Sequence, residues 1–218
     1  MIRRSARFLL VLTACAAATS VTPSAQALPP TELLGTGGPV IPLKNAAMID
    51  RTPDGYRYRA GQQNSHLTIT KVDGKLLYRD TGTRELRGIP GSCSRRSVPT
   101  GIAALCTIPA EFNARNKMFL EVWPRLGNDF VNGSTLPASM RLWVLADAGN
   151  DTVLGGAGDD FVNGAHDTDR VWGGPGNDWI RGGSGNDRLY GGTGNDRLLG
   201  QDGADIVRGG AGTDRVER

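Results

Sequence analysis

The sequence predicts an all-β protein whose C-terminal third, built from short repeats, follows a β-rich middle region. A nine-residue repeat runs without a gap from Gly149 to Arg218. Upstream of it, residues 62–123 hold short segments rich in β-branched and aromatic residues, bounded by turn-forming residues. Glycine accounts for 31 of the 218 residues, with 19 of these in residues 149–218. This is about twice the usual share of glycine and indicates many tight turns.

The N-terminal segment has the composition of a secretory signal peptide. Three arginines precede an apolar stretch at residues 8–21, and Ala25-Gln26-Ala27 supplies the small residues of a cleavage site. We therefore expect residues 1–27 to be a signal peptide and the protein to be secreted to the extracellular side. No run of 18 uninterrupted apolar residues occurs, so the sequence predicts no membrane span.

The three cysteines support export. Leu12-Thr13-Ala14-Cys15 resembles the cleavage motif of bacterial lipoproteins, so a lipid anchor at Cys15 is the alternative to soluble release. In either case Cys93 and Cys106 remain, and in an oxidising compartment we expect them to form a disulfide. This bond would close a loop of about 14 residues and contribute about 3 kcal/mol. Two free thiols or a metal-binding pair are the alternatives.

The region between the leader and the repeats divides into two segments. Residues 28–60 are interrupted by proline and glycine without sustained periodicity, which predicts an irregular N-terminal segment or linker. Residues 61–148 are expected to be β-rich. The predicted strands are His66–Val72, Lys75–Tyr78, Ile102–Ile108 and Met118–Trp123.

Two fragments of this segment look like degenerate repeats. Residues 127–131 look like a stray unit, but Asp129 precedes Asp151 by 22 residues and is therefore out of register with it. Residues 143–145 fit the strand frame of the repeats, although Leu142 occupies the position where an aspartate is expected.

Each repeat unit contains one aspartate and, two residues later, one aliphatic residue. The aspartates are Asp151, Asp160, Asp169, Asp178, Asp187, Asp196, Asp205 and Asp214. The aliphatic residues are Val153, Val162, Val171, Ile180, Leu189, Leu198, Val207 and Val216. Eight units in one register, with paired glycines in the same frame, are a repeat architecture and not a chance pattern.

The unit reads G-G-x-G-x-D-x-U-x and resembles the RTX, or haemolysin-type, calcium-binding nonapeptide repeat. This resemblance covers residues 149–218, about a third of the chain. It implies a parallel β-roll in which six residues turn around Ca²⁺ and three form a strand, so that two units make one coil. It also implies two stacks of turns. One would hold Asp151, Asp169, Asp187 and Asp205, and the other Asp160, Asp178, Asp196 and Asp214.

The chemistry of these residue types suits that implication. Ca²⁺ takes six to eight oxygen ligands, which carboxylates and backbone carbonyls of neighbouring turns can supply. Stacked coils place like-charged aspartates about 5 Å apart, which is unfavourable without a cation. The aliphatic core is also thin for a chain of about 70 residues. We therefore expect the repeat region to be largely disordered without calcium and to fold on binding several ions.

Three turns depart from the pattern. Residues 164–169 lack two of the expected glycines, residues 200–205 lack one, and residues 146–148 replace the opening pair of the first unit. We expect calcium sites that use these turns to be weak or empty. His166 is interpreted as a tolerated turn residue, because a hard cation prefers oxygen ligands.

The layout as a whole is similar to that of secreted calcium-binding proteins of actinobacteria. This similarity implies that the β-rich middle forms metal-free coils that cap the roll. We expect a non-enzymatic calcium-binding protein, since the sequence contains no metalloprotease, hydrolase or P-loop motif. Glu85, Glu111 and Glu121 are candidates for an acid–base pair, but scattered carboxylates on a β protein are interpreted here as solvated surface.

Two other functions stay open. The protein could be a calcium-dependent adhesin or cell-wall-binding module that uses the basic middle region or the outward aromatic residues of the repeats. It could also be a small secreted hydrolase with an RTX tail. The basic residues of the middle region are interpreted as a solvated face, and no nucleic-acid partner is expected.

Charge is distributed unevenly along the chain. The net charge of +3 equals the contribution of the three arginines before residue 8. Residues 28–148 have 15 basic and 10 acidic residues, whereas residues 149–218 have 7 basic and 12 acidic ones. The repeat segment is therefore the part with the charge to hold cations.

Overall fold

The computed structural model describes residues 45–218, so the predicted signal peptide and Cys15 lie outside the described residues. These residues form eighteen β-strands and no helix, which confirms the all-β prediction. Accordingly, no helix in this part of the chain is long and apolar enough to cross a membrane.

The first seven strands form mixed and antiparallel pairs, which we call the cap. They are β1 (Ala46–Thr52), β2 (Gly55–Arg59), β3 (His66–Val72), β4 (Lys75–Asp80), β5 (Glu85–Gly88), β6 (Cys93–Arg96) and β7 (Ile102–Thr107). Antiparallel hairpins join β1 to β2 and β3 to β4, and β7 lies between β4 and β6. The predicted strands at β3 and β4 are present, as is that at β7, with bounds that agree within two residues.

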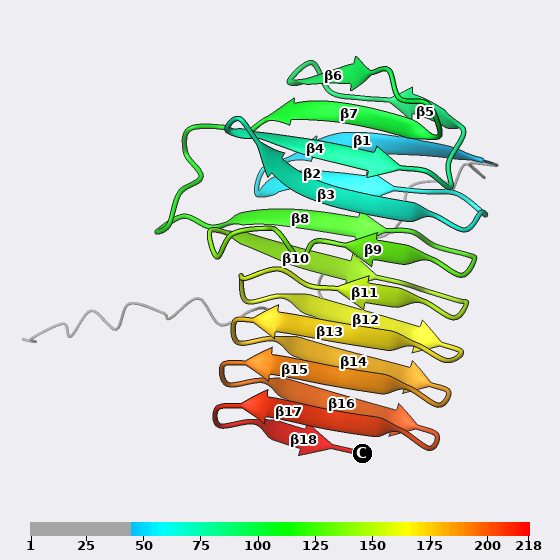
Figure 1. Cartoon of the computed structure of the whole chain (residues 1–218), viewed down its shortest axis with the longest axis vertical. Helices are drawn as coiled ribbons and strands as arrows, with labels where there is room; N and C mark the ends of the chain where they lie inside the picture. The colour runs from blue at the N-terminus through cyan, green and yellow to red at the C-terminus, as the bar shows by residue number, and fades with distance from the viewer. Residues whose placement is uncertain (1–44) are drawn as a thin grey trace, which may run out of the picture. The chain divides into compact units, whose positions relative to one another are not determined.

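The remaining strands wind into a parallel β-solenoid, which we call the roll (Figure 1). They are β8 (Met118–Trp123), β9 (Phe130–Asn132), β10 (Met140–Leu145), β11 (Thr152–Leu154), β12 (Phe161–His166), β13 (Arg170–Pro175), β14 (Trp179–Ser184), β15 (Arg188–Thr193), β16 (Arg197–Asp202), β17 (Ile206–Ala211) and β18 (Arg215–Glu217). The parallel β-roll implied by the resemblance is therefore present.

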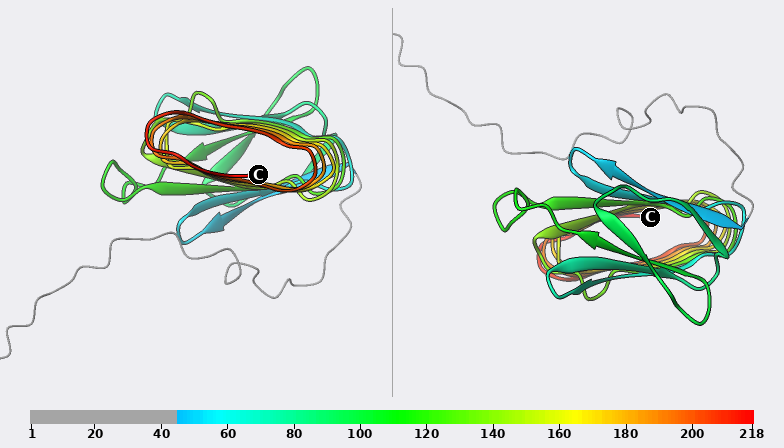
Figure 2. Two further views of the ribbon diagram at one scale, coloured as in Figure 1. Left: turned by 90° about the horizontal axis from the view of Figure 1, so that it is seen from below. Right: turned by 90° about the horizontal axis from the view of Figure 1, so that it is seen from above.

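Two nine-stranded sheets face each other, and successive strands of the roll alternate between them (Figure 2). Sheet A has the order β18-β16-β14-β12-β10-β8-β2-β1-β5, and sheet B the order β17-β15-β13-β11-β9-β3-β4-β7-β6. Because β2 pairs in parallel with β8 and β3 with β9, the cap continues both sheets of the roll without a break.

The aliphatic residue of each repeat points between the two sheets. Val153 pairs with Val171 across β11 and β13, and Val162 pairs with Ile180 across β12 and β14, so each column repeats every second unit. All but the last member of the two columns are at most 3% exposed, and Val216 in the last strand is 40% exposed. The predicted inward orientation is confirmed for the roll interior, and it places the preceding aspartate of every unit at an edge between the sheets.

The prediction that Asp129 is out of register with the repeats is wrong. In β9, Phe130 lies opposite Thr152 and Val131 opposite Val153, the same register that the later repeats use. The extra four residues lie in the connection between β9 and β10, which adds length to the loop without shifting either strand. Sequence spacing failed here because a loop can absorb an insertion that a strand register cannot.

The expectation of irregular chain up to residue 60 is also wrong where the structure describes it. Residues 46–59 form the β1–β2 hairpin around the turn at residues 53–54, so the proline and glycine mark a turn and not a linker. Tyr56, Tyr58 and Tyr78 fill the core of the cap. The expected disulfide is present and joins Cys93 of β6 to Cys106 of β7.

Candidate metal-binding turns

The aspartates of the repeats form two ladders, one at each edge of the roll. The backbone N–H of each aspartate donates to Oδ1 of the aspartate 18 residues later, over 2.8–3.0 Å within the repeats. One ladder contains Asp151, Asp169, Asp187 and Asp205, and the other Asp160, Asp178, Asp196 and Asp214. The two stacks implied by the repeat pattern are therefore the stacks of the structure.

The second carboxylate oxygen of most of these aspartates has no hydrogen-bond partner, although it is buried. Among the described residues this holds for Oδ2 of Asp129, Asp151, Asp169, Asp178, Asp187, Asp196 and Asp205. Asp160 differs, because its Oδ2 accepts a 2.6 Å hydrogen bond from the Gly156 N–H. A buried oxygen with no donor costs free energy, so each orphaned Oδ2 requires another electropositive partner.

Five of these seven oxygens, those of Asp169, Asp178, Asp187, Asp196 and Asp205, face a glycine whose position would not accept a side chain. The first glycine of a turn stands five residues before its aspartate. A Cβ added to Gly173 would lie under 3.0 Å from Oδ2 of Asp178 and from the carbonyl oxygen of Gly191 in the next coil. The same arrangement of glycine, Oδ2 and next carbonyl recurs at Gly164, Gly182 and Gly191. Gly155 has the same surroundings, but Oδ2 of its Asp160 already accepts the Gly156 hydrogen bond, so four spaces between successive coils combine an unpartnered Oδ2 with a carbonyl of the next coil.

The other turns are less complete. Gly200 and Gly209 face the Oδ2 of their own aspartates, but no carbonyl of a following coil lies beside them. Residues at the corresponding position before Asp151 and Asp129 are Ala146 and Pro124, which both have a Cβ. The four complete spaces therefore belong to Asp169, Asp178, Asp187 and Asp196.

The donor set fits a hard cation. No cluster of three or more histidine, cysteine, aspartate or glutamate side chains occurs in the part of the chain that the structure describes. A cation here would need backbone carbonyls to complete its shell, and Ca²⁺ is the common biological cation that accepts them readily at high coordination number. The one nitrogen or sulfur ligand in these turns is His166, which is exposed, so the donor set of sulfur and nitrogen that Zn²⁺ prefers is not available.

The pKa shifts of the ladder aspartates also favour a bound cation. Burial raises the pKa of Asp178 and of Asp151 to about 8, and the pKa of Asp169 to about 7. Burial also raises the pKa of Asp187 and of Asp196, with a further contribution from the neighbouring aspartate of the same ladder. The ionised carboxylates are thus held in an unfavourable environment that a bound cation would relieve.

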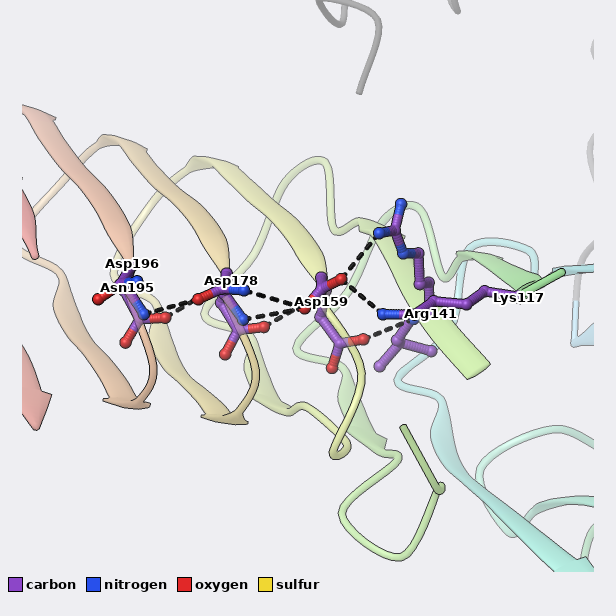
Figure 3. A network of polar contacts seen from close by, with 9 residues as sticks. Lys117, Arg141, Asp159, Asp178, Asn195 and Asp196 are labelled. Atoms are coloured by element: carbon purple, nitrogen blue, oxygen red, sulfur yellow. Dashed lines mark hydrogen bonds and ion pairs between the residues drawn. The ribbon is translucent and has the colours of Figure 1, made fainter. Parts of the chain in front are cut away.

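A second ladder runs beside each row of aspartates, one residue earlier in the chain, and Figure 3 shows the one that ends at Asp159. The Asn195 N–H donates to Oδ1 of Asn177, and the Asn177 N–H donates to Oδ1 of Asp159. At the end of this ladder, Oδ2 of Asp159 accepts hydrogen bonds of 2.7 Å from Lys117 and from Arg141. Burial opposes ionisation of Asp159, but these donors outweigh it and lower its pKa to about 2.

On the opposite edge, the same asparagine ladder extends upstream of the repeats. The Asn150 N–H donates to Oδ1 of Asn128, and the Asn128 N–H donates to Oδ1 of Asn64. The Ser65 N–H correspondingly donates to Oδ1 of Asp129. Sequence reasoning missed these members, and the signal that could have found them is the Asn-Asp dipeptide at residues 128–129 followed by an alternating strand.

The turns that depart from the repeat pattern keep the backbone of the others. Ala165, Asp167 and Gln201 adopt positive φ angles of 71–80° at positions where other units have glycine. A residue with a Cβ is strained in this region, so these turns are held in shape by their neighbours. His166 is exposed, and its Nδ1 lies 3.0 Å from Oγ of Ser184 in the next coil.

The three carboxylates weighed as catalytic pairs lie apart. Glu85 pairs with Arg87, Glu111 with Arg51 and Glu121 with Arg57, on three different parts of the fold. The structure therefore does not bring them together.

Comparison with known proteins identifies the repeats. Residues 145–180, 167–198 and 181–216 match the sequence model of the RTX calcium-binding nonapeptide repeat, which spans four copies. No curated protein and no solved structure matches the chain. The match begins four residues before the first repeat defined above and covers both aspartate ladders, but it does not extend to Asp129 or to the cap.

Proposed function

Residues 145–216 are RTX calcium-binding repeats folded as a parallel β-solenoid, and on that premise we propose that the protein is an exported, non-enzymatic calcium-binding protein. In this proposal the roll folds around Ca²⁺ ions held between successive coils. The observation that carries it is the row of buried, donor-free Oδ2 atoms, four of which face both a glycine and a carbonyl of the next coil.

The four complete spaces would be the principal calcium sites. Asp169 and Asp187 would serve one edge, with the carbonyls of Gly182 and Gly200, and Asp178 and Asp196 the other edge, with those of Gly191 and Gly209. The other four repeat aspartates, Asp151, Asp160, Asp205 and Asp214, would be weaker ligands, because their turns lack an open glycine space, an unpartnered oxygen or a following coil.

Bound calcium would supply positive charge and link neighbouring coils. The protein residues would hold the ligand atoms in position. The Oδ1 hydrogen bond fixes each carboxylate against the previous coil, so that Oδ2 points at the glycine space. The positive φ of Gly174 and Gly192 turns the backbone at the same corners. Calcium then replaces repulsion between stacked carboxylates with coordination that spans two coils.

Calorimetric titration of the purified protein with calcium tests this proposal, with circular dichroism recorded alongside. We expect about four ions per chain and a gain of β-sheet signal on calcium addition after EDTA treatment. An absence of binding heat together with unchanged spectra would overturn the proposal. Magnesium serves as the control cation, since it demands a smaller octahedral shell and should bind weakly.

Export is a separate part of the proposal. It rests on the N-terminal sequence pattern and on the Cys93–Cys106 disulfide, because disulfides and RTX repeats are typical of secreted proteins. Expression of the full chain in a bacterial host, followed by fractionation and N-terminal sequencing, tests it. A mature N-terminus at Leu28 in the medium supports soluble release. A lipid-modified N-terminus at Cys15 indicates envelope anchoring, and full-length protein retained in the cytoplasm contradicts export.

A further inference from the structure

The outward side of sheet B, which we call the B face, is strongly cationic. Within the nine strands of sheet B the single carboxylate is Asp80, which points into the core and is 1% exposed. Alternation along each strand places six basic side chains on the outward side. They are Lys75, Arg79, Arg96, Arg170, Arg188 and Arg208.

The outward side of sheet A is different, although the same repeats build it. There Arg57 pairs with Glu121, Arg59 with Asp50, Arg87 with Glu85 and Arg215 with Glu217. None of the six basic residues of the B face forms an ion pair within residues 45–218. The carboxylates of sheet A thus pair with cations of the cap and of the last strand, whereas Arg181 and Arg197, its other repeat arginines, have no ion pair within residues 45–218.

The arrangement of the B-face arginines is unfavourable for the protein alone. Arg170 lies directly opposite Arg188 on neighbouring strands, and such like-charge pairs are destabilising. Arg208 is held over the ring of Tyr190, 5.8 Å from its centroid, and Tyr190 in turn stacks on Trp172. The stacked aromatic rings therefore support the arginine side chains. An anion placed between the arginines would remove the repulsion between their charges.

The cap part of the B face contains two adjoining grooves. The first, of about 400 Å³, crosses β3, β4 and β9 and is lined by hydroxyl groups, apolar side chains and Arg79. The second, of about 410 Å³, begins at the same Arg79 and continues over β4, β7 and β6, with Lys75 and Arg96 in its lining. The hydroxyl lining of the first groove comes from Thr68, Thr70 and Thr81. Asp73, in the turn after β3, is the one carboxylate at the grooves.

Two groups of cations result, one on the roll and one on the cap. Arg170 on β13 and Arg79 on β4 are separated by four strand spacings in sheet B. At 4.7–4.9 Å per spacing this is about 20 Å, with the threonine-lined groove between them. A small anion cannot contact both groups, whereas an extended polymer can.

We propose that the B face binds a linear acidic polysaccharide. Its anionic groups would pair with the arginines of the roll and with the basic residues of the cap, and its hydroxyl groups would hydrogen-bond in the threonine-lined groove. Single-stranded nucleic acid fits less well, because stacking of bases needs open aromatic faces. The face of Trp172 is stacked on Tyr190, and the face of Tyr190 meets Arg208.

Binding at the roll part would depend on calcium, and this dependence rests on the proposed function. Residues 149–218 have seven basic and twelve acidic residues, which leaves a net charge of −5 without metal. Four bound Ca²⁺ ions would bring this segment to about +3, so calcium would convert it from repelling a polyanion to attracting one. The cap part would keep its positive charge in either state.

Affinity measurements with hyaluronan oligosaccharides test the proposal on the purified protein in 1 mM calcium and low salt. The test variant combines Arg170→Gln, Arg188→Gln and Arg208→Gln on the B face. A matched control combines Arg181→Gln, Arg197→Gln and Arg215→Gln, which removes the same charge from outward positions of sheet A in the same repeats. Calcium titration of each protein shows separately whether the metal sites remain.

We expect the B-face variant to lose about tenfold in affinity and the sheet A variant to lose about twofold or less, with unchanged calcium binding in both. EDTA should weaken binding of the unaltered protein, and neutral dextran should not bind. Equal losses in the two variants would overturn the assignment to the B face. Tighter binding of an oligothymidine than of hyaluronan would overturn the polysaccharide class, as would no retention of hyaluronan at low salt.

Discussion

The cap and the roll bury the same chemical group in opposite ways. In the cap, Asp80 is 1% exposed, and its Oδ1 accepts hydrogen bonds from the N–H groups of His66, Gly82 and Thr83. Its Oδ2 accepts hydrogen bonds from the hydroxyls of Tyr58 and Thr83. Asp178 in the roll is 2% exposed, yet its Oδ2 has no donor. In the cap, hydrogen bonds from the protein satisfy both carboxylate oxygens. In the roll, one carboxylate oxygen remains available to a cation.

The difference extends to the whole of each region. The cap has three buried tyrosines, antiparallel hairpins and a disulfide. The repeats of the roll have one core aliphatic residue per nine, and the glycines of their turns are entropically expensive to order. We therefore expect the cap to hold its structure without metal and the roll to require it, which yields predictions about where each region fails.

Calcium should have the largest effect on stability. Four sites, each saturated to about 100 times its Kd, would add roughly 11 kcal/mol to the free energy of unfolding of the roll. Chemical denaturation followed by circular dichroism should show a single roll transition that moves strongly with calcium. A second transition, from the cap, should hardly move, and a calcium shift of equal size in both would remove the distinction.

Replacing single aspartates should separate the two roles. Asp80→Asn should destabilise the cap by about 2–3 kcal/mol at any calcium concentration, because it weakens a fully satisfied, charge-assisted network. Asp178→Asn should instead lower the calcium stoichiometry by about one and leave the metal-free protein no less stable. Calorimetry and denaturation of both variants measure this, and reduced calcium binding in Asp80→Asn would contradict it.

Reduction of the disulfide should affect the cap alone. Loss of the Cys93–Cys106 cross-link, which spans a sequence separation of 13, should cost about 3 kcal/mol of cap stability. Calcium affinity of the Cys93→Ala, Cys106→Ala double variant should match that of the unaltered protein. A changed affinity would show that the cap and the calcium sites are coupled.

The roll should also respond to pH through its buried aspartates. In the metal-free roll, burial raises the pKa of Asp178 from 3.8 to about 8, so this group favours folding below pH 4 and loses that contribution as the pH rises through 8. Metal-free roll structure should therefore decrease between pH 5 and pH 8. Calcium must displace the same protons, so its affinity should be about tenfold or more weaker at pH 5.5 than at pH 8. Calcium titrations with proton-release measurement check both signs.

The smallest effect concerns the strained turns of the roll. Ala165→Gly and Gln201→Gly should each stabilise the calcium-bound roll by up to about 1 kcal/mol, because glycine adopts their positive φ without strain. The gain is reduced by the greater freedom of glycine in the unfolded chain. Thr193→Gly, at a turn position without positive φ, is the matched control and should not stabilise the roll.

The sequence predicted the roll well because its repeat is tied to strand register. Each Asp and each aliphatic residue recurs at one spacing, and the strand pairs of β11 to β18 reproduce that spacing without exception. The prediction was wrong at Asp129, because a longer loop changes the spacing in sequence without changing the strand register. It was also wrong at residues 46–59, where a hairpin was interpreted as a linker. Both depend on contacts between distant strands, which local patterns do not encode.

The candidate site was predicted in part. The eight aspartates and their two stacks follow from the repeat, but the roles of the two carboxylate oxygens do not. Oδ1 accepts a backbone hydrogen bond, whereas Oδ2 has no hydrogen-bond partner. Asp160 is the exception among the central aspartates, because both of its oxygens accept hydrogen bonds. These differences depend on backbone geometry. The cationic B face could not be predicted from the sequence either, because its residues come from strands up to 133 residues apart, from Lys75 to Arg208.

Hydrogen–deuterium exchange of the full protein, with calcium and with EDTA, tests the central claim most directly. It resolves the cap and the roll in one sample and reports the stability of each backbone hydrogen bond. We predict that residues 46–107 stay protected in both conditions, whereas residues 152–217 are protected only with calcium. Equal protection of residues 152–217 in EDTA and in calcium would contradict the account.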